Sequence, residues 1–247
     1  MAAPMLRVGC AMWADRRWIG RYLPDETAPG RELAAYATWC TAVEGNTTFY
    51  GLPAPSTVDR WAEDAPAAFR FVFKLPRTIT HDRRLRSADA EVTETLDRLA
   101  PLGERAAPIS IQLPASFGPD DLGVLDRFLQ SLSWDWSWAV EVRHERFAQG
   151  GAEERALNDL LARHGAERII IDTRAVFAGP RDTPAEIEAF ERKPRLPVRP
   201  VAIGSHPVVR FIGQTAASAN PGWWSKWVPK VAQWLEEGRT PTFFVHT

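Results

Sequence analysis

The sequence predicts an α/β fold, a single (β/α)8 TIM-type barrel domain that spans residues 1–247. Eight short runs rich in β-branched and aromatic residues recur along the chain, and helical patterns separate most of them. Strands that alternate with helices are typical of a parallel sheet, and eight such units in one domain of this length favour a barrel. The alternative is an open doubly wound sheet, but the G-x-G-x-x-G turn that would favour it is absent after the first run.

The predicted strands are short and apolar, as expected for strands of a parallel sheet. In chain order they are residues 7–13, 42–50, 69–76, 108–114, 137–144, 168–174, 207–213 and 242–247. No helical pattern follows the last run. We therefore expect the barrel to end after its eighth strand, without the last helix.

Amphipathic patterns between these runs predict the helices. Apolar residues at 33, 36, 37 and 40 have helical spacing. Ser56 or Thr57 is a candidate N-cap for the second helix, Ser87 is one for the third, and Gly165 is a candidate C′ residue. The remaining helical segments are residues 54–65, 87–100, 118–132, 153–165 and 220–238.

The segment 175–206 occupies the place of the sixth helix and is rich in proline and charge. We interpret it as an extended βα loop with a short helix near residues 184–192. Loops of this length in compact domains are more often functional than idle.

Composition excludes several classes of protein. A formal net charge of −1 provides no overall basic field for nucleic acid. The two cysteines, Cys10 and Cys40, are too few for a disulfide scaffold and are expected to be reduced thiols. We see no secretory signal and no run near the 18 apolar residues of a membrane span. We expect a cytoplasmic protein that does not enter a membrane, and the oligomeric state stays open.

Charged side chains are predicted to face the inside of the barrel. In a barrel strand one face packs on helices and the other points inward, with its top layer at the carboxyl-end mouth. Val140 and Val142 are the apolar neighbours of Glu141 and Arg143, so the two charges are predicted to point inward. The same alternation predicts these inward side chains: Glu44, Asn46, Arg70, Val72, Lys74, Ser110, Gln112, Ile170, Asp172, Arg174, Arg210, Phe244 and His246.

A purely structural role is the alternative for these charges. Glu141 could pair with Arg143 or Arg210, and Asp172 with Lys74, in a satisfied network. Burying so many charges is costly unless function retains them, so we favour a functional set.

The predicted mouth has more bases than acids, which favours an anionic ligand such as a phosphate or carboxylate. We predict that substrate is bound by Lys74, Arg143, Arg210, Asn46, Gln112, Tyr50 and Trp13. Tyr50 and Trp13 could stack on a ring of sugar or base type. The acids with His246 could instead bind a divalent metal, but no H-E-x-x-H or C-x-x-C supports this. No metal ligand is assigned, and the cofactor is left unknown.

Seven segments of the chain resemble the motifs of one known family. They are VEGNTTFYGLP, FRFVFKLPRTITH, QLPASFGP, VEVRH, IDTR, VVRFIG and FFVHT. They resemble the YecE-like family of unknown function (domain of unknown function family 72), and the match covers nearly the whole chain. Members usually continue after the final His-Thr with a Pro-Asp-Asn-like turn and a last helix, both of which this sequence lacks.

The resemblance implies a (β/α)8 barrel, sometimes described as related to sugar isomerases, with no established reaction. Fold analogy alone does not assign a function. The matching motif positions are Glu44, Asn46, Thr47, Tyr50, Lys74, Thr80, His81, Gln112, Glu141, Arg143, His144, Asp172 and Arg210.

The leading hypothesis is an enzyme that acts on a small anionic, phosphorylated or sugar-like compound. Glu44, Glu141 or Asp172 would serve as general acid or base, and His81 would transfer a proton. A second hypothesis is a nucleic-acid-binding or nucleic-acid-processing barrel that uses exposed aromatic residues and the loop bases Arg77, Arg83, Arg84 and Arg86. A third is a non-catalytic protein that binds a ligand or partner.

Overall fold

The computed structural model describes residues 4–133 and 135–246. Within them, parallel strands lie at all eight predicted runs. They are β1 (Arg7–Cys10), β2 (Ala42–Gly45), β3 (Arg70–Phe73), β4 (Ile109–Gln112), β5 (Trp138–Glu141), β6 (Glu167–Asp172), β7 (Val208–Ile212) and β8 (Thr242–His246). The positions predicted for the strands are confirmed.

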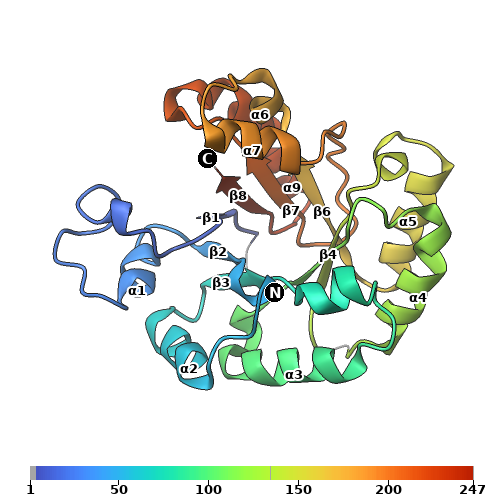
Figure 1. The fold of residues 1–247 in the computed structure, drawn as a ribbon, viewed down its shortest axis with the longest axis horizontal. Helices are drawn as coiled ribbons and strands as arrows, with labels where there is room; N and C mark the ends of the chain where they lie inside the picture. Colours follow the sequence, from blue (N-terminus) through green and yellow to red (C-terminus); the bar gives the residue numbers. More distant parts are fainter. Residues whose placement is uncertain (1–3, 134, 247) are drawn as a thin grey trace.

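The strands form two hydrogen-bonded sheets rather than one closed barrel (Figure 1). Six strands pair in the order β1-β8-β7-β6-β5-β4, and β2 pairs with β3. The prediction of a closed (β/α)8 barrel is therefore wrong. The molecule is an α/β protein with an open, half-barrel parallel sheet and a separate strand pair.

A tyrosine hydroxyl interrupts the ladder between β1 and β2. Tyr36 Oη accepts a hydrogen bond from the Cys10 amide at 2.7 Å and donates one to the Ala42 carbonyl at 3.0 Å. These backbone groups are thus satisfied by a side chain instead of by the neighbouring strand. Between β3 and β4 the ladder is reduced to a single isolated bridge, between Lys74 and Ser110.

Replacing Tyr36 with phenylalanine should lower the free energy of unfolding by about 1–3 kcal/mol, because a buried donor and a buried acceptor lose their partner. Tyr36 is fully buried. Urea unfolding followed by fluorescence measures the change. The matched control is Tyr22→Phe, because Tyr22 is 49% exposed. Equal losses in the two variants would contradict the bridging role of Tyr36.

Helices follow the strands as predicted, with differences at their starts. The helices are α1 (Glu32–Tyr36), α2 (Pro55–Asp64), α3 (Asp89–Leu99), α4 (Leu122–Ser131), α5 (Ala152–Arg163), α6 (Arg174–Ala178), α7 (Pro184–Arg192), α8 (Pro221–Trp224) and α9 (Val228–Glu236). None of the helices described here is long and apolar enough to cross a membrane. The long loop predicted at 175–206 holds α7 at the predicted residues 184–192.

The predicted N-caps are wrong, and the predicted C′ glycine is confirmed. Pro55 occupies the first turn of α2, so the helix starts before Ser56 and Thr57. Ser87 has a left-handed φ of 48° and lies outside α3, whose N-cap is Ala88. Gly165 has φ of 59° just after α5, which is the conformation that ends a helix.

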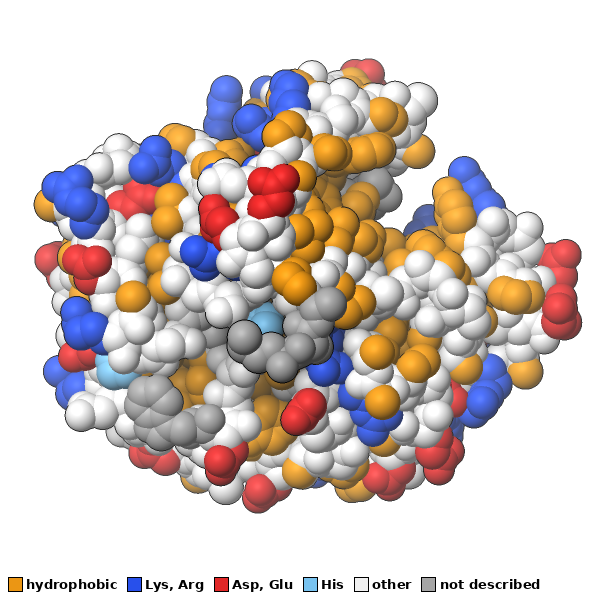
Figure 2. Space-filling view, turned by 180° about the vertical axis from the view of Figure 1, so that it is seen from behind, with side chains coloured by type: hydrophobic (Ala, Val, Ile, Leu, Met, Phe, Trp, Pro, Cys, Tyr) orange, Lys and Arg blue, Asp and Glu red, His pale blue; other side chains and the backbone are white. Residues whose placement is uncertain are grey.

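Two apolar layers lie on the two faces of the strands. On the outer face, Phe71 and Phe73 stack on Trp61 of α2, with ring centroids 6.3 and 5.5 Å away. Val8, on the outer face of β1, is 39% exposed, whereas Phe71 is fully buried. Seen from behind, apolar side chains gather along a hollow between the lobe that carries α1 and the lobe that carries α9 (Figure 2). The inner face of the strands holds a smaller apolar layer, which supports the site described next.

Candidate functional site

A layer of polar side chains lies directly above an apolar plug on the inner face of the strands. The plug consists of Ala42, Val72, Ala139, Ile169, Val208 and Phe244. Side chains alternate along a strand, so the residue two positions farther on points the same way, one layer nearer the carboxyl end. In five strands that residue is polar: Glu44, Lys74, Glu141, Arg210 and His246. We call these five residues, with Gln112 and Arg143, the mouth cluster.

Arg210 of β7 is the central cation of the mouth cluster. Its Nε donates to Glu44 Oε2 at 2.8 Å, and its Nη1 donates to Glu141 Oε2. Arg143 completes the chain of contacts, because its Nε donates to Glu141 Oε1 at 2.8 Å. The Arg210 guanidinium thus joins Glu44 and Glu141, which lie almost 100 residues apart in sequence.

Lys74 and His246 approach the other side of Glu44. Lys74 Nζ donates to Gln112 Oε1 at 2.9 Å and lies 2.9 Å from Glu44 Oε1. His246 Nε2 lies 2.8 Å from Glu44 Oε2. The angles of both contacts to Glu44 fall outside hydrogen-bond geometry, so Glu44 Oε1 and His246 Nε2 lack a hydrogen-bond partner among the described residues. We treat the Lys74 contact as charge attraction. Burial lowers the pKa of His246, so its imidazole is neutral at pH 7. Glu44 Oε1 and His246 Nε2 therefore keep hydrogen-bonding capacity at the site.

The residues of the mouth cluster differ in their exposure to solvent. Glu44, Glu141 and Arg210 are 1%, 0% and 4% exposed. The Arg143 side chain, in contrast, is 21% exposed. Arg143 is therefore the cation of the cluster best placed to meet a ligand from solvent.

Both carboxylates of the mouth cluster are ionised at neutral pH. Burial raises the pKa of each, but the nearby cations outweigh it. Arg210 and Lys74 hold the pKa of Glu44 well below its ordinary value, and Arg210, Arg143 and Lys74 lower the pKa of Glu141 to about 2. Neither group can donate a proton near pH 7, so the two residues can act as bases or as anchors for cations.

His81 lies beside the mouth cluster on a single π-helical turn, Thr78–Asp82. Such turns are frequent at functional sites. Burial and the charges of Arg143 and Arg77 lower the pKa of His81, so its imidazole is neutral at pH 7. The ring packs edge-on against Phe49, with centroids 5.2 Å apart, and Phe49 in turn contacts Tyr50, which is 85% exposed.

Asp172 does not join the mouth cluster, contrary to the orientation predicted for it. Its carboxylate accepts from Trp227 Nε1 at 2.8 Å and from Arg174 Nε at 2.9 Å. Ile170 packs with Trp227 in the outer core, while Ile169 belongs to the inner plug. The predicted alternation in β6 is thus wrong by one residue. Ile171 takes the mouth position, and Asp172 and Arg174 point away from it.

Two predicted substrate-binding residues have structural contacts of their own. Trp13 packs edge-on against Trp61 and Phe71 of the outer core, with centroids 5.2 and 6.1 Å away, so it does not face the mouth cluster. Asn46 Nδ2 donates to the Ala11 carbonyl at 3.0 Å and fastens the end of β2 to the loop after β1.

Lys193 lies near the mouth cluster and is not among the predicted site residues. It directly follows α7 and is partly buried. Burial and the charges of Arg210, Arg143 and Lys74 lower its pKa. One sequence signal could have indicated it: only four of the thirty Lys and Arg residues are lysines, and two of those four, Lys74 and Lys193, lie here.

The basic loop after β3 is largely neutralised by acids. Arg77 pairs with Asp82, Arg83 with Glu91, and both Arg84 and Arg86 with Asp121. Paired guanidinium groups have less charge to offer to phosphates of nucleic acid. The geometry therefore gives the nucleic-acid hypothesis no specific support.

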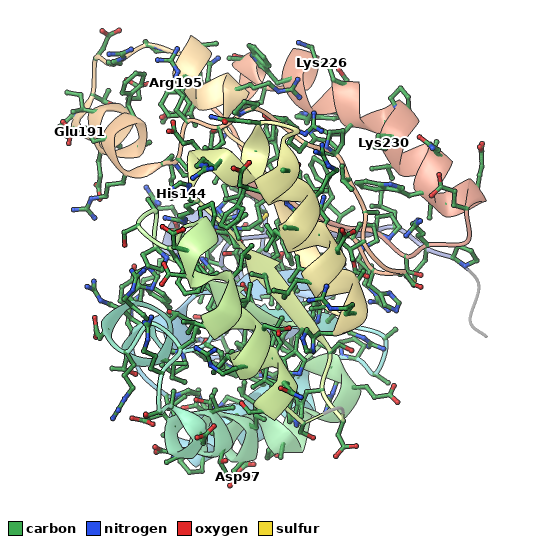
Figure 3. All side chains as sticks on the ribbon, turned by 90° about the vertical axis from the view of Figure 1, so that its right-hand side faces the viewer. Asp97, His144, Glu191, Arg195, Lys226 and Lys230 are labelled. Carbon is green, nitrogen blue, oxygen red and sulfur yellow. The ribbon has the colours of Figure 1, made fainter. Side chains whose placement is uncertain are left out.

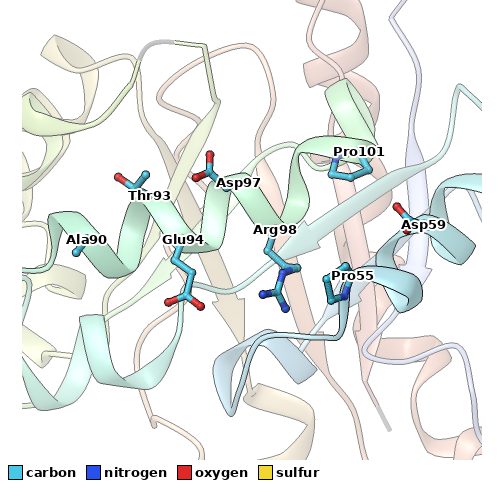
Figure 4. A pocket seen from close by; sticks show the side chains of 8 residues that line it. All are labelled: Pro55, Asp59, Ala90, Thr93, Glu94, Asp97, Arg98 and Pro101. Atoms are coloured by element: carbon cyan, nitrogen blue, oxygen red, sulfur yellow. The ribbon is translucent and has the colours of Figure 1, made fainter.

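Two cavities of about 610 Å³ lie away from the mouth cluster. One is between α2 and α3, lined by Pro55, Glu94 and Arg98 among others (Figure 4). The other is at the opposite ends of the strands, lined by residues such as Arg7 and Glu167. In the part of the chain that the structure describes, no three His, Cys, Asp or Glu side chains gather to hold a metal ion.

Comparison with known proteins shows which family the sequence resembles. The model of the family "Protein of unknown function DUF72" matches residues 7–247. The UPF0759 protein YecE of Escherichia coli K12 is 40% identical over 243 residues, which cover 98% of this chain and 86% of that protein. The UPF0759 protein YunF of Bacillus subtilis is 28% identical over 80 residues, 32% of this chain and 27% of that protein.

Solved structures are similar over almost the whole chain. A DUF72 family protein from Enterococcus faecalis superposes with a TM-score of 0.72 at 20% identity, covering 99% of this chain and 91% of its own. A DUF72 family protein from Thermotoga maritima superposes with a TM-score of 0.70 at 18% identity, covering 98% and 92%. At these identities the likeness concerns the fold alone.

Proposed function

Because the chain belongs to the DUF72 family of proteins of unknown function, the family assigns no reaction, and we propose a function from the geometry of the mouth cluster. We propose an enzyme that binds a small anionic, phosphorylated or sugar-like substrate at the carboxyl ends of its strands. We also propose a cytoplasmic location, which is supported by the free thiols of Cys10 and Cys40.

The observation that carries this proposal is the excess of cations over acids in a buried cluster. Lys74, Arg143 and Arg210 face two carboxylates, Glu44 and Glu141. Since both carboxylates are ionised, the cluster has one positive charge left over. An uncompensated buried charge is unfavourable, and an anion from solvent would offset it. The same cations around each carboxylate make the cluster a poor fit for a divalent metal ion.

The roles in this proposal follow from exposure and charge. Arg143, the exposed cation, binds the anion through its guanidinium fork. Glu141 and Arg210 hold Arg143 in position from below. His81, neutral at pH 7, accepts a proton from the substrate, and the cations stabilise the negative charge that then develops.

Replacing Arg143 with methionine should weaken binding of inorganic phosphate by about 10- to 100-fold, because a charge-assisted hydrogen bond is lost. Isothermal titration calorimetry measures the dissociation constants. The matched control is Arg146→Met, which removes the same charge from an exposed side chain that pairs with Glu153. If the two variants bind phosphate as well as the unaltered protein does, Arg143 is not the anion site.

Catalysis needs a separate test, because a binding protein without turnover would pass the first one. The protein is incubated with a panel of phosphorylated and carboxylated sugars, and loss of each compound is followed by nuclear magnetic resonance. We expect turnover of at least one compound and a loss of about 100-fold or more in His81→Asn. Phosphate binding without any turnover would contradict the enzymatic part of the proposal.

A further inference from the structure

Lys193 is held close to the mouth cluster by a small packed unit. Phe177 of α6 packs edge-on against Phe190 of α7, with centroids 4.8 Å apart. Arg195 lies over the Phe177 ring, with its guanidinium carbon 5.4 Å from the centroid. The lysine therefore sits in a structured part of the long βα loop.

The loop is also fastened to the end of β6. Thr173 Oγ1 donates to the Pro194 carbonyl at 2.8 Å, and Pro194 is the next residue after Lys193. Figure 3 shows Glu191 and Arg195, which flank the lysine, on the same side of the molecule as His144, which follows β5. These contacts fix the backbone of Lys193 over the carboxyl ends of the central strands.

Lys193 forms no salt bridge with an Asp or Glu side chain among the described residues, although it is partly buried near cations. Its neighbour Arg192 pairs with Glu188. The charges that act most strongly on Lys193 are those of Arg210, Arg143 and Lys74, and Glu44 is the acid that opposes them. Placing a fourth cation beside three others is unfavourable unless an anion lies between them.

The charge balance with Lys193 included indicates the charge of the ligand. The mouth cluster alone has an excess of one positive charge. Lys193 in its protonated form raises the excess to two, and a bound anion favours that form. A phosphate monoester carries close to two negative charges at pH 7, whereas a carboxylate carries one.

We propose that Lys193 makes this site selective for dianions, so that the ligand of the mouth cluster is a phosphate monoester and not a simple carboxylate. This inference rests on the proposed function and names its substrate class. Arg143 binds one face of the phosphoryl group from β5, and Lys193 binds it from the loop above.

The test compares Lys193→Gln with Arg192→Gln, adjacent variants that lose the same charge. In Arg192→Gln the lost side chain is exposed and already paired. Titration calorimetry with inorganic phosphate and with acetate gives the dissociation constants, and circular dichroism checks that both variants fold. We expect Lys193→Gln to weaken phosphate binding by about 10- to 100-fold, to change acetate binding by less than about threefold, and Arg192→Gln to change neither.

The outcomes separate this inference from the proposed function. If the unaltered protein and Lys193→Gln bind phosphate equally, while Arg143→Met does not bind it, the role of Lys193 is refuted and the anion site stands. If both Lys193→Gln and Arg192→Gln weaken binding equally, the effect is one of overall charge and the inference is again refuted. If the unaltered protein binds neither anion, both the inference and the proposed function fail.

Discussion

Arg210→Met should lower the free energy of unfolding by about 3–5 kcal/mol, the range found when one partner of a buried ion pair is removed. Arg210 donates to Glu44 and to Glu141, and all three residues are at most 4% exposed. Without the guanidinium, two carboxylates remain buried with Lys74 and Arg143 as their main cations. Urea unfolding followed by the fluorescence of the tryptophans measures the loss.

A triple variant separates charge from packing in that experiment. Arg210→Met combined with Glu44→Gln and Lys74→Met removes the Glu44 carboxylate together with the two cations that contact it, and it leaves Glu141 paired with Arg143. We expect the triple variant to recover much of the lost stability, because no uncompensated charge remains. If the single and triple variants are equally unstable, the loss arises from packing around residue 210 and the electrostatic explanation is wrong.

Acid should destabilise the protein through Glu141 in a defined range of pH. The pKa of Glu141 is lowered from 4.5 to about 2 in the folded protein. A carboxyl whose pKa is lower in the folded than in the unfolded state adds stability above its unfolded pKa, and this stability is lost as the pH falls through its folded pKa. The range is thus from about pH 4.5 down to about pH 2, and a shift of this size corresponds to about 3 kcal/mol.

The measurement is a difference between the unaltered protein and Glu141→Gln across that range. Urea unfolding at pH 2, 3, 4, 5 and 6 gives the free energy of both proteins. The stability advantage of the unaltered protein should shrink by about 3 kcal/mol between pH 6 and pH 2. Because the ion pair between Glu141 and Arg210 is buried, 0.5 M salt should change this difference in stability little. A constant difference at all pH values would show that the cations do not stabilise the ionised form of Glu141.

The alternation of apolar and polar residues predicted the residues of the mouth cluster in those strands where the alternation is clear. Glu141 lies between valines, and Lys74 follows three phenylalanines at alternate positions, so the inward face could be read directly. In β6 three isoleucines follow one another, at 169, 170 and 171. A continuous apolar run has no alternation, and both orientations of Asp172 are compatible with it.

Closure of the sheet depends on contacts that alternation does not encode. The strand ladder between β1 and β2 is interrupted by the hydroxyl of Tyr36, which comes from α1. In the sequence Tyr36 is simply an apolar-face residue of a predicted helix. Its hydrogen bonds to Cys10 and Ala42 exist only once the helix packs against both strands.

The sequence by itself determined where the eight strands lie and, in the strands that alternate, which charged side chains point to the inner face, because period-two alternation is a local property of the backbone. The tertiary structure decided that the strands form two sheets, that Asp172 turns to Trp227, and that Lys193 lies near cations in or just after three different strands. These outcomes depend on which side chains lie close enough to a given backbone group or charge in the folded protein to bind it. Contacts between residues that are distant in sequence cannot be predicted from the alternation within one strand.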